Sequence, residues 1–575
     1  MNFTKRCLGG LAGCVLMLAA GCGESGNAGS QPEAEFVYAN RGEVSTLDPN
    51  QMSWMQDIRV GQALFEGVYV LHPETLEPIL GTAQAVDVSD DGMVYTITLR
   101  EEAKWSNGDA VTSDDFIFAW RRMMREPGDY SYLVNDYIAG AKDYADAYEK
   151  DPNAADFEAV GISKIDDRTF EVTLDHYIGY FPGLLAFSPY LPLHEASMKA
   201  FERTDDAGRV TYDPAYFTKP ETLVTNGAYT LGRWDLKVGQ TLVMNENYWD
   251  KASVKSRTIR CLDLPDVNQQ LQRYEAGMVD WLTDIPGQNA ADMRDQGRDD
   301  IHIFPAYGTY FWVFNTYGTL PDGRENPLAD RRVRQALTMA IDKDQIVDIV
   351  KLDQMPATNY VPANAEYFPG YTYPDGLSFD VERAKALLAE AGYPSGQNFP
   401  RLKLLHNTDT GDHAQVAQNL RRQWANNLGV QFDLDGVDSA QFKARYRPEL
   451  KNGELKPGQF EISRGSWYGD YLDVSTFTDK YAANSLNNDG AWVNAEYNRL
   501  LDEASRTRDP QERLDILSRA EGVLLQEAPI LPLYHYVNSF VHRPDVTGIP
   551  KNAKNFVVMK NVQTPRSTGP GVAGK

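Results

Sequence analysis

The fold class is decided by residues 93–124, which read MVYTITLREEAKWSNGDAVTSDDFIFAWRRMM. Apolar and polar residues alternate over 93–100, which predicts a half-buried strand. Asp90-Asp91-Gly92 comes directly before this strand and is typical of a hairpin turn. A helix is predicted from Ser113 to Met124, because acidic residues in a first turn favour the helix start. A strand that is followed by a helix predicts a mixed α/β protein.

The same alternation of strands and helices continues to the end of the chain, and no internal repeat is found. The later half is predicted to be more helical, and Asp509-Pro510 is expected to break its last long helix. Further strands are predicted at 168–174, 258–262, 460–463 and at the end of 528–540; helices at 331–350, 381–391, 413–427 and 494–525; and a surface loop at 449–458.

Length and composition describe an acidic, globular protein. The 575 residues suggest two to four domains, and 42% of them are apolar and 24% charged. The formal net charge of −25 argues against a nucleic-acid binder, which needs a basic face. Four cysteines exclude a disulfide scaffold. Cys261 lies in a predicted strand and is interpreted as a small buried side chain.

The first segment is predicted to be a targeting signal. Lys5 and Arg6 precede an apolar stretch that is too short to span a bilayer, so residues 1–21 are expected to be removed. Small residues followed by Cys22 are typical of a bacterial lipoprotein signal, in which the thiol of Cys22 carries lipid; plain secretion is the alternative. Residues 22–35 are predicted to be a flexible tether and residues 564–575 a disordered tail.

A search for catalytic motifs finds none that is complete. The eight histidines show no HExxH spacing, and the sequence has no CxxC, no GxSxG elbow, no P-loop and no GxGxxG after a strand. A calcium-loop interpretation of Asp87 to Thr98 fails, because its twelfth position is Thr98 instead of Glu. We therefore expect a protein that is not an enzyme and that holds no cofactor or metal.

Several runs appear in the same order as in one protein family. They resemble the bacterial extracellular solute-binding proteins of family 5 (cluster C), which serve ATP-binding cassette importers, and most of all the oligopeptide-binding members. The resemblance covers about residues 36–560. Its runs are LFEGVY at 64–69, KWSNGDAVTSDDF at 104–116, TNGAY at 225–229 with NYW at 247–249, VRQAL at 333–337 with IDK at 341–343, FEISRGSWYGDY at 460–471 and APILPLY at 528–534.

This resemblance implies a type II periplasmic-binding-protein fold, in which two lobes enclose the ligand and a third domain is added. Mapped by motif, lobe 1 takes 36–65, 195–306 and 532–563. The extra domain takes 66–194, and lobe 2 takes 307–531. A hinge is expected where the chain crosses between the lobes, near Gly308 and Leu531.

The resemblance also assigns residues to a peptide site. Asp470 is expected to bind the α-ammonium group, although an Asp that caps the turn after Gly469 is the alternative. Backbone pairing with the peptide is expected from Ser466 to Tyr468 on one side and from Ser53 to Met55 on the other. Trp467 would form the wall of a side-chain pocket, or belong to the core instead, and Tyr130 lies one position from a site tyrosine of the family.

Cations are expected at the carboxylate end of the peptide. The family pattern places Arg464, His413 and Lys351 there, and Arg464 can bind a carboxylate through two hydrogen bonds. His413 could instead be a surface residue at a helix start. The pattern departs from the family at Gly308 and Tyr468, which replace a cysteine pair.

The resemblance implies an oligopeptide ligand, the permease and ATPase subunits of an importer, and a monomeric protein held at the membrane through Cys22, in the cell envelope. No nucleic acid is expected. The alternatives are a dipeptide or another small solute in the same fold, or a peptide sensor that is not coupled to transport.

Overall fold

The computed structural model of the chain describes residues 35–364, 366–409, 411–451, 454–483 and 485–565. The predicted signal peptide, Cys22 and nearly all of the tether lie outside the described residues, as do residues 566–575 of the predicted tail. The first described element is strand β1 at Glu35–Asn40. Thr564 is 3% exposed, so the packed part of the chain continues into the segment predicted as tail.

One sheet of ten strands runs through both halves of the molecule. Together with the helices around it, this sheet confirms the mixed α/β class. In spatial order its strands are β10 (Tyr229–Asp235), β11 (Gly239–Met244), β12 (Thr258–Asp263), β1, β13 (Trp281–Leu282), β20 (Ile530–His542), β14 (Ile301–Phe314), β19 (Ile462–Tyr468), β15 (Leu402–Asn407) and β16 (Phe432–Val437). The cysteine predicted to be buried, Cys261, lies in β12 at 1% exposure.

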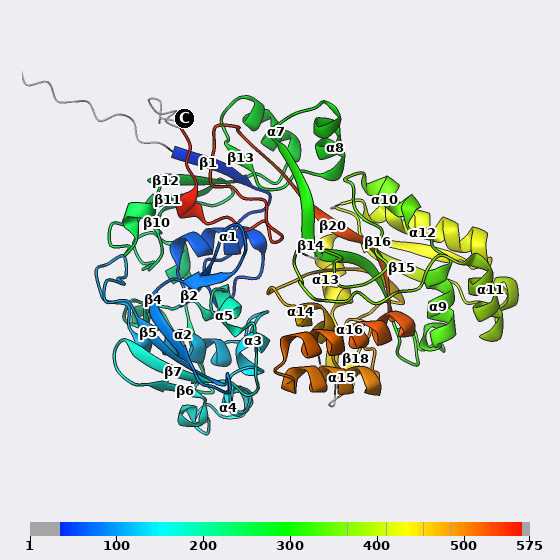
Figure 1. Cartoon of the computed structure of the whole chain (residues 1–575), viewed down its shortest axis with the longest axis horizontal. Coiled ribbons are helices and arrows are strands. Elements are labelled where there is room, and N and C mark those ends of the chain that lie inside the picture. The colour runs from blue at the N-terminus through cyan, green and yellow to red at the C-terminus, as the bar shows by residue number, and fades with distance from the viewer. Residues whose placement is uncertain (1–34, 365, 410, 452–453, 484, 566–575) are drawn as a thin grey trace, which may run out of the picture.

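Strands β14 and β20 join the two halves of the molecule. They pair antiparallel from Ile301↔Val541 to Val313↔Ile530 and run from the lobe 1 side to the lobe 2 side, as Figure 1 shows. Their register shifts between Pro305 and Thr309, which is the segment that contains Gly308. The crossing therefore falls where the sequence predicts the hinge, although the domain boundaries themselves stay a prediction.

The half that holds lobe 1 also carries the extra domain, which has a sheet of its own. Its strand order is β4 (Ala83–Val88), β5 (Val94–Leu99), β7 (Thr169–Thr173) and β6 (Ile162–Lys164). Helix α2 (Ser113–Arg125) lies as the sequence predicts, and Thr112 and Asp115 form a capping box at its start. The other helices of this half are α1 (Met55–Leu64), α3 (Tyr132–Asn135), α4 (Ala141–Lys150), α5 (Phe181–Leu184), α6 (Glu195–Met198), α7 (Val267–Glu275) and α8 (Gly287–Asp295).

Lobe 2 forms the other half of the molecule. Its helices cover both faces of the part of the large sheet that belongs to this lobe. Asp509 caps the last long helix and Pro510 opens it, because proline fits a first helical position where no amide is needed. The helices of lobe 2 are α9 (Arg331–Met339), α10 (Asp344–Val350), α11 (Val381–Glu390), α12 (His413–Leu428), α13 (Ser439–Tyr446), α14 (Ser475–Thr478), α15 (Ala495–Arg506) and α16 (Pro510–Glu527).

Two local predictions are wrong. The segment 331–350 is not one helix, because α9 ends at Met339 and α10 starts at Asp344. Tertiary contacts hold the break open: the Gln423 side chain accepts from the backbone amide of Asp342, and Lys343 Nζ donates to Ala357 O. The predicted loop at 449–458 contains a short hairpin, β17 (Glu449–Lys451) and β18 (Glu454–Lys456).

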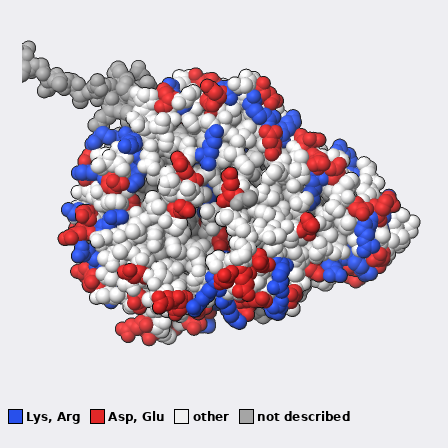
Figure 2. Space-filling model, in the orientation of Figure 1, with Lys and Arg blue, Asp and Glu red and all other residues white. Residues whose placement is uncertain are grey.

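Surface charge is mixed on the face seen in Figure 2. Lysine and arginine side chains alternate with acidic ones around both halves, and no broad basic area covers this face. Among the described residues, no helix combines the length and the apolar character needed to cross a bilayer.

Candidate functional site

Strand β19 forms the lobe 2 wall of the candidate site. It pairs antiparallel with β14, and the register sets Ser466 opposite Tyr310 and Tyr468 opposite Gly308. The two positions that replace the family's cysteine pair are thus direct neighbours. A Cβ atom on Gly308 would lie 2.8 Å from Tyr468 Cδ1, so the tyrosine ring occupies the space that a side chain at residue 308 would need.

The far edge of β19 lacks a strand over most of its length. Residues 462–468 pair with β14 on one side, whereas β15 pairs on the other side only with Ile462 and Ser463. Among the described residues, Ser466, Trp467 and Tyr468 therefore present one backbone edge that no strand covers. An uncovered edge of this kind can accept an extended peptide as an added strand.

Four tyrosines, Tyr310, Tyr468, Tyr534 and Tyr536, form what we call the aromatic wall. Tyr468 stacks on Tyr536 with ring centroids 4.7 Å apart, and Tyr310 stacks on Tyr534 at the same distance. Tyr468 is nevertheless 50% exposed. A large ring that is stacked on one face and open on the other offers apolar surface to a ligand.

Arg464 and His413, two of the predicted carboxylate-binding residues, lie together beside this wall. Arg464 Nε donates to Asn407 Oδ1 at 2.8 Å, and its Nη1 donates to Ser466 Oγ at 3.2 Å. The guanidinium carbon lies 4.5 Å from the centroid of the Phe442 ring. Asn407, Phe442 and Ser466 all belong to lobe 2, so the position of Arg464 is set within that lobe.

His413, at the start of α12, stacks on Tyr310 and lies 3.2 Å from its hydroxyl through Nδ1. Burial is the main cause that lowers the pKa of His413 to about 3, and the positive charge of Arg464 contributes to the same shift. His413 is therefore neutral near pH 7. It can form a hydrogen bond to a ligand but adds no positive charge.

Lys351, the third predicted cation, lies near the start of α12, because its positive charge acts on Asp412, the residue directly before His413. It ends α10 in a left-handed conformation with φ 61° and is exposed. Its Nζ donates to Gln288 Oε1 in α8 at 2.9 Å, which links lobe 2 to lobe 1.

Asp470 lies just beyond β19 and faces the extra domain. Its Oδ2 accepts a hydrogen bond from Tyr132 OH at 2.8 Å, whereas turn capping would direct it to an amide of its own turn. Burial raises the pKa of Asp470, while hydrogen bonds from Tyr132 and Tyr130 and the nearby charges of Lys554 and Lys480 oppose that rise. Tyr130, the predicted site tyrosine, thus lies beside Asp470 together with Tyr132.

Trp467 is half-buried and held in place from two sides. Its indole N–H donates to Thr476 O at 2.7 Å, and Lys480 Nζ lies 4.7 Å from the ring centroid. Lys480 itself forms a buried ion pair with Asp489 at 2.6 Å. The ring therefore belongs partly to the core and partly to the site, between the two interpretations that the sequence allows.

The lobe 1 side of the site differs from the expectation at one residue. Trp54 is extended, with φ −101° and ψ 143°, and occupies the position before α1, whereas Met55 is already the first helical residue. The extended backbone that could pair with a peptide thus ends at Trp54, and only Ser53 and Trp54 remain for that role. The side chains of Trp54 and Met55 are 53% and 46% exposed.

The two halves meet across the site in this structure. Lys443 of lobe 2 lies over the Trp54 ring at 5.4 Å, and Arg447 pairs with Asp129 of the extra domain at 3.3 Å. Tyr180 of the extra domain stacks on Tyr471, the neighbour of Asp470, at 4.3 Å. The contact from Tyr132 to Asp470 is therefore one of several that close the site from the extra-domain side.

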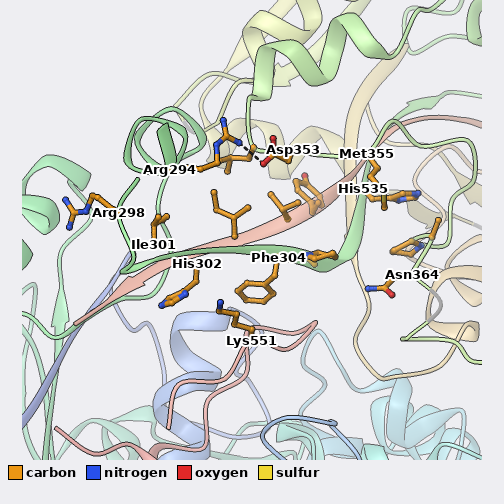
Figure 3. A pocket seen from close by; sticks show the side chains of 18 residues that line it. Arg294, Arg298, Ile301, His302, Phe304, Asp353, Met355, Asn364, His535 and Lys551 are labelled. Atoms are coloured by element: carbon orange, nitrogen blue, oxygen red, sulfur yellow. Dashed lines mark hydrogen bonds and ion pairs between the residues drawn. The ribbon is translucent and has the colours of Figure 1, made fainter. Parts of the chain in front are cut away.

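A pocket of about 460 Å³ lies along the crossing strands β14 and β20, and Tyr536 of the aromatic wall is one of the residues that line it. Figure 3 shows Arg294 and Asp353 on one side of these strands and Lys551 on the other. Arg294 Nη1 and Asp353 Oδ2 lie 2.6 Å apart and join α8 of lobe 1 to the segment after α10 of lobe 2. None of the predicted peptide-binding residues lines this pocket, so we call it the hinge pocket.

Sequence reasoning missed Tyr132, Lys554 and most of the aromatic wall. Tyr132 is two residues from the predicted Tyr130, so the tyrosine spacing there was a usable signal. Tyr534 and Tyr536 alternate in a predicted buried strand, which indicates that both lie on one face. Lys554 carries no sequence signal, because only the fold brings it to Asp470.

Comparison with known proteins agrees with this geometry. A model of the family described as bacterial extracellular solute-binding proteins, family 5 Middle, matches residues 77–489. The oligopeptide-binding protein OppA of Bacillus subtilis is 29% identical over 509 residues, which is 86% of each chain. The dipeptide-binding protein DppE of the same organism is 29% identical over 568 residues, which is 96% of each chain.

A solved structure supports the fold directly. The murein tripeptide binding protein MppA of Escherichia coli superposes with a TM-score of 0.76 and 27% sequence identity, covering 93% of this chain and 99% of that chain. This match confirms the predicted binding-protein fold with its large central sheet.

Proposed function

The chain belongs to family 5 of the bacterial extracellular solute-binding proteins, as its sequence predicts, and from this premise we propose that it captures oligopeptides between its lobes for an ATP-binding cassette importer. Members of this family bind substrates and are not enzymes. The two relatives named above bind an oligopeptide and a dipeptide, which supports a peptide as the ligand.

The observation that carries the proposal is the uncovered edge of β19 between two charged ends. Ser466 to Tyr468 offer main-chain groups along this edge, which give affinity without reading side chains. Asp470 follows the edge on one side and Arg464 precedes it on the other. A peptide added as a strand would thus have its amino group at Asp470 and its carboxylate at Arg464.

The remaining predicted residues take supporting roles in this proposal. His413 would donate or accept a neutral hydrogen bond near the carboxylate, and Lys351 would reach only a longer peptide. Trp467 and the exposed ring of Tyr468 would contact side chains, because aromatic rings tolerate many shapes. Ser53 and Trp54 would pair with the peptide backbone from lobe 1, with Met55 at the edge of that contact.

Delivery to the importer completes the proposal. We infer that residues 1–21 are removed, that Cys22 carries lipid, and that the monomeric protein acts in the cell envelope beside a permease and its ATPase. A tether of about a dozen residues would let the protein move between ligand capture and the permease. The domain boundaries predicted from the motifs belong to this proposal as well.

Mass spectrometry of the purified protein under native conditions tests the central claim. We expect co-purified peptides of several lengths and sequences, which leave when the protein is unfolded and rebind when it is refolded. Only dipeptides in the mixture would favour the dipeptide alternative. A protein that binds no peptide, but is saturated by another small solute, would overturn the proposal.

A further inference from the structure

The amino end of the site holds a second cation, Lys554. This residue lies after β20, in the lobe 1 segment 551–556. Its Nζ donates to the backbone oxygen of Asp470 at 2.5 Å and lies 5.4 Å from the centroid of the Phe187 ring of the extra domain. Lobe 1, lobe 2 and the extra domain therefore meet at this one side chain.

The backbone around Lys554 is fixed by its neighbours. Ala553 O accepts from the amide of Tyr307 at 3.0 Å and from the side chain of Asn538 at 3.1 Å. Asn552 Nδ2 donates to Pro73 O at 2.7 Å, and Asn555 Nδ2 donates to Thr283 O at 2.9 Å. Because the residues on either side of Lys554 are hydrogen-bonded to other parts of the chain, the fold directs the ammonium group of Lys554 toward Asp470.

The charges at this end balance before any peptide arrives. Lys480 forms its ion pair with Asp489, and its positive charge also acts on Asp470 together with that of Lys554. In the described part of the chain no carboxylate lies within ion-pair distance of Lys554, and Asp470 is the acid whose charge acts on it. Burial lowers the pKa of Lys554 to about 8, so Lys554 remains mostly charged near pH 7.

A free α-ammonium group would add a second positive charge to this balanced pair. An N-acylated amino end would not, since its amide carries no charge. Its N–H could donate to the carboxylate of Asp470, and its acyl carbonyl could accept from Lys554. Both groups of the site would then be used without leaving a buried charge unpaired.

We propose that Lys554 is a specificity-determining residue of the amino-end subsite, and that it lets this subsite take peptides whose amino group is acylated. The inference rests on the proposed function and adds N-acylated peptides to its ligand class. It assigns the amide N–H of the ligand to Asp470 and the acyl oxygen to Lys554.

Calorimetry with two matched ligands tests the assignment. The ligands are Ala-Phe-Ala-Ala with a free amino group and the same peptide with an N-acetyl group. We expect the wild-type protein to bind the two with affinities within about tenfold of each other. Lys554→Met should strengthen the free-amine peptide by about tenfold or more and weaken the acetylated one by about threefold.

Lys551→Met is the matched control, because Lys551 lies three residues earlier in the same segment, is exposed, and lines the hinge pocket instead of contacting Asp470. It should leave the ratio of the two affinities unchanged. Lys554→Arg keeps the positive charge and should keep the wild-type ratio. If Lys554→Met does not fold, Lys554→Gln replaces it in the same measurement.

The outcomes separate this inference from the proposed function. If the wild-type protein binds both peptides and the ratio is the same in Lys554→Met, then Lys554 is only structural and the inference is overturned. A wild-type preference for the free-amine peptide far beyond tenfold would overturn it as well. If the wild-type protein binds neither peptide, the proposed function itself falls, and the inference falls with it.

Discussion

At the amino end of the proposed site, Asp470 of lobe 2 is met by Tyr132 of the extra domain and Lys554 of lobe 1, whereas at the carboxylate end Arg464 is held by lobe 2 alone. The first arrangement exists only when the halves are together. The second is complete within a single lobe. The difference suggests an order of events, in which the carboxylate of a peptide docks on lobe 2 and closure then completes the amino end.

The largest expected effect comes from breaking the end that depends on closure. Asp470→Asn should weaken peptide binding by about 30-fold or more, because removing one partner of a buried charged contact costs roughly 2–5 kcal/mol. The variant also leaves Lys554 without its balancing charge. Calorimetry measures the loss, and thermal unfolding verifies that the variant is folded. A loss of less than about threefold would show that Asp470 does not contact the ligand.

Removing the cation at the preformed end should have the next largest effect. Arg464→Met should weaken a peptide with a free carboxylate by about tenfold, because one charge-assisted contact is lost. The same peptide with a C-terminal amide should lose little between wild type and variant. The four affinities form a double-mutant cycle, and additive effects would mean that Arg464 does not bind the carboxylate.

A smaller effect is expected when only the closing contact is removed. Tyr132→Phe deletes the hydroxyl that donates to Asp470 and keeps the ring. A hydrogen bond to a charged group is worth about 1.5–3 kcal/mol, and part of this is recovered by water. We therefore expect about a threefold to tenfold loss, seen mainly as faster dissociation in surface plasmon resonance. A change confined to the association rate would contradict a role in closure.

The smallest effect concerns pH at the preformed end. Because the pKa of His413 is lowered to about 3, this residue stays neutral as pH falls from 7.5 to 5.5. Protonation of His413 should therefore add nothing to the pH dependence of peptide affinity over that range, and the pH profiles of wild type and His413→Gln should agree within about twofold. Tighter binding as pH falls through 6.5, lost in His413→Gln, would show that His413 acts as a cation after all.

The lowered pKa of His413 also determines how this residue makes folding stability depend on pH. A histidine whose pKa is lowered in the folded state binds fewer protons there than in the unfolded chain between pH 6.5 and 3. Its contribution to stability is thus fully present above pH 6.5 and is lost as pH falls toward 3.

Local signals in the sequence predicted the parts of the fold that local chemistry determines. The start of α2 at Ser113 and the helix break at Asp509-Pro510 lie where they were expected, because helix starts depend on the nearest backbone groups. The break between α9 and α10 could not be predicted, since it depends on Gln423 and on Ala357, which are distant in sequence.

The candidate site also contains some residues that the sequence predicts and others that it does not. The sequence and its family resemblance name Asp470, Arg464 and Tyr468, and the structure brings the last two to one strand that ends just before Asp470. Tyr132 and Lys554 reach Asp470 from segments 338 and 84 residues away. Contacts over such separations leave no pattern in a single sequence, so the residues that complete this site around Asp470 are the ones that only the fold reveals.

The register shift between Pro305 and Thr309 also has a mechanical consequence. A two-stranded ribbon resists bending mainly through the bonds between its strands, and three residues of β14 here face a single residue of β20. We therefore expect the ribbon to bend most easily where the halves join. The amide of Tyr307 in this stretch bonds to Ala553, so the segment that carries Lys554 is tied to the ribbon at that same place.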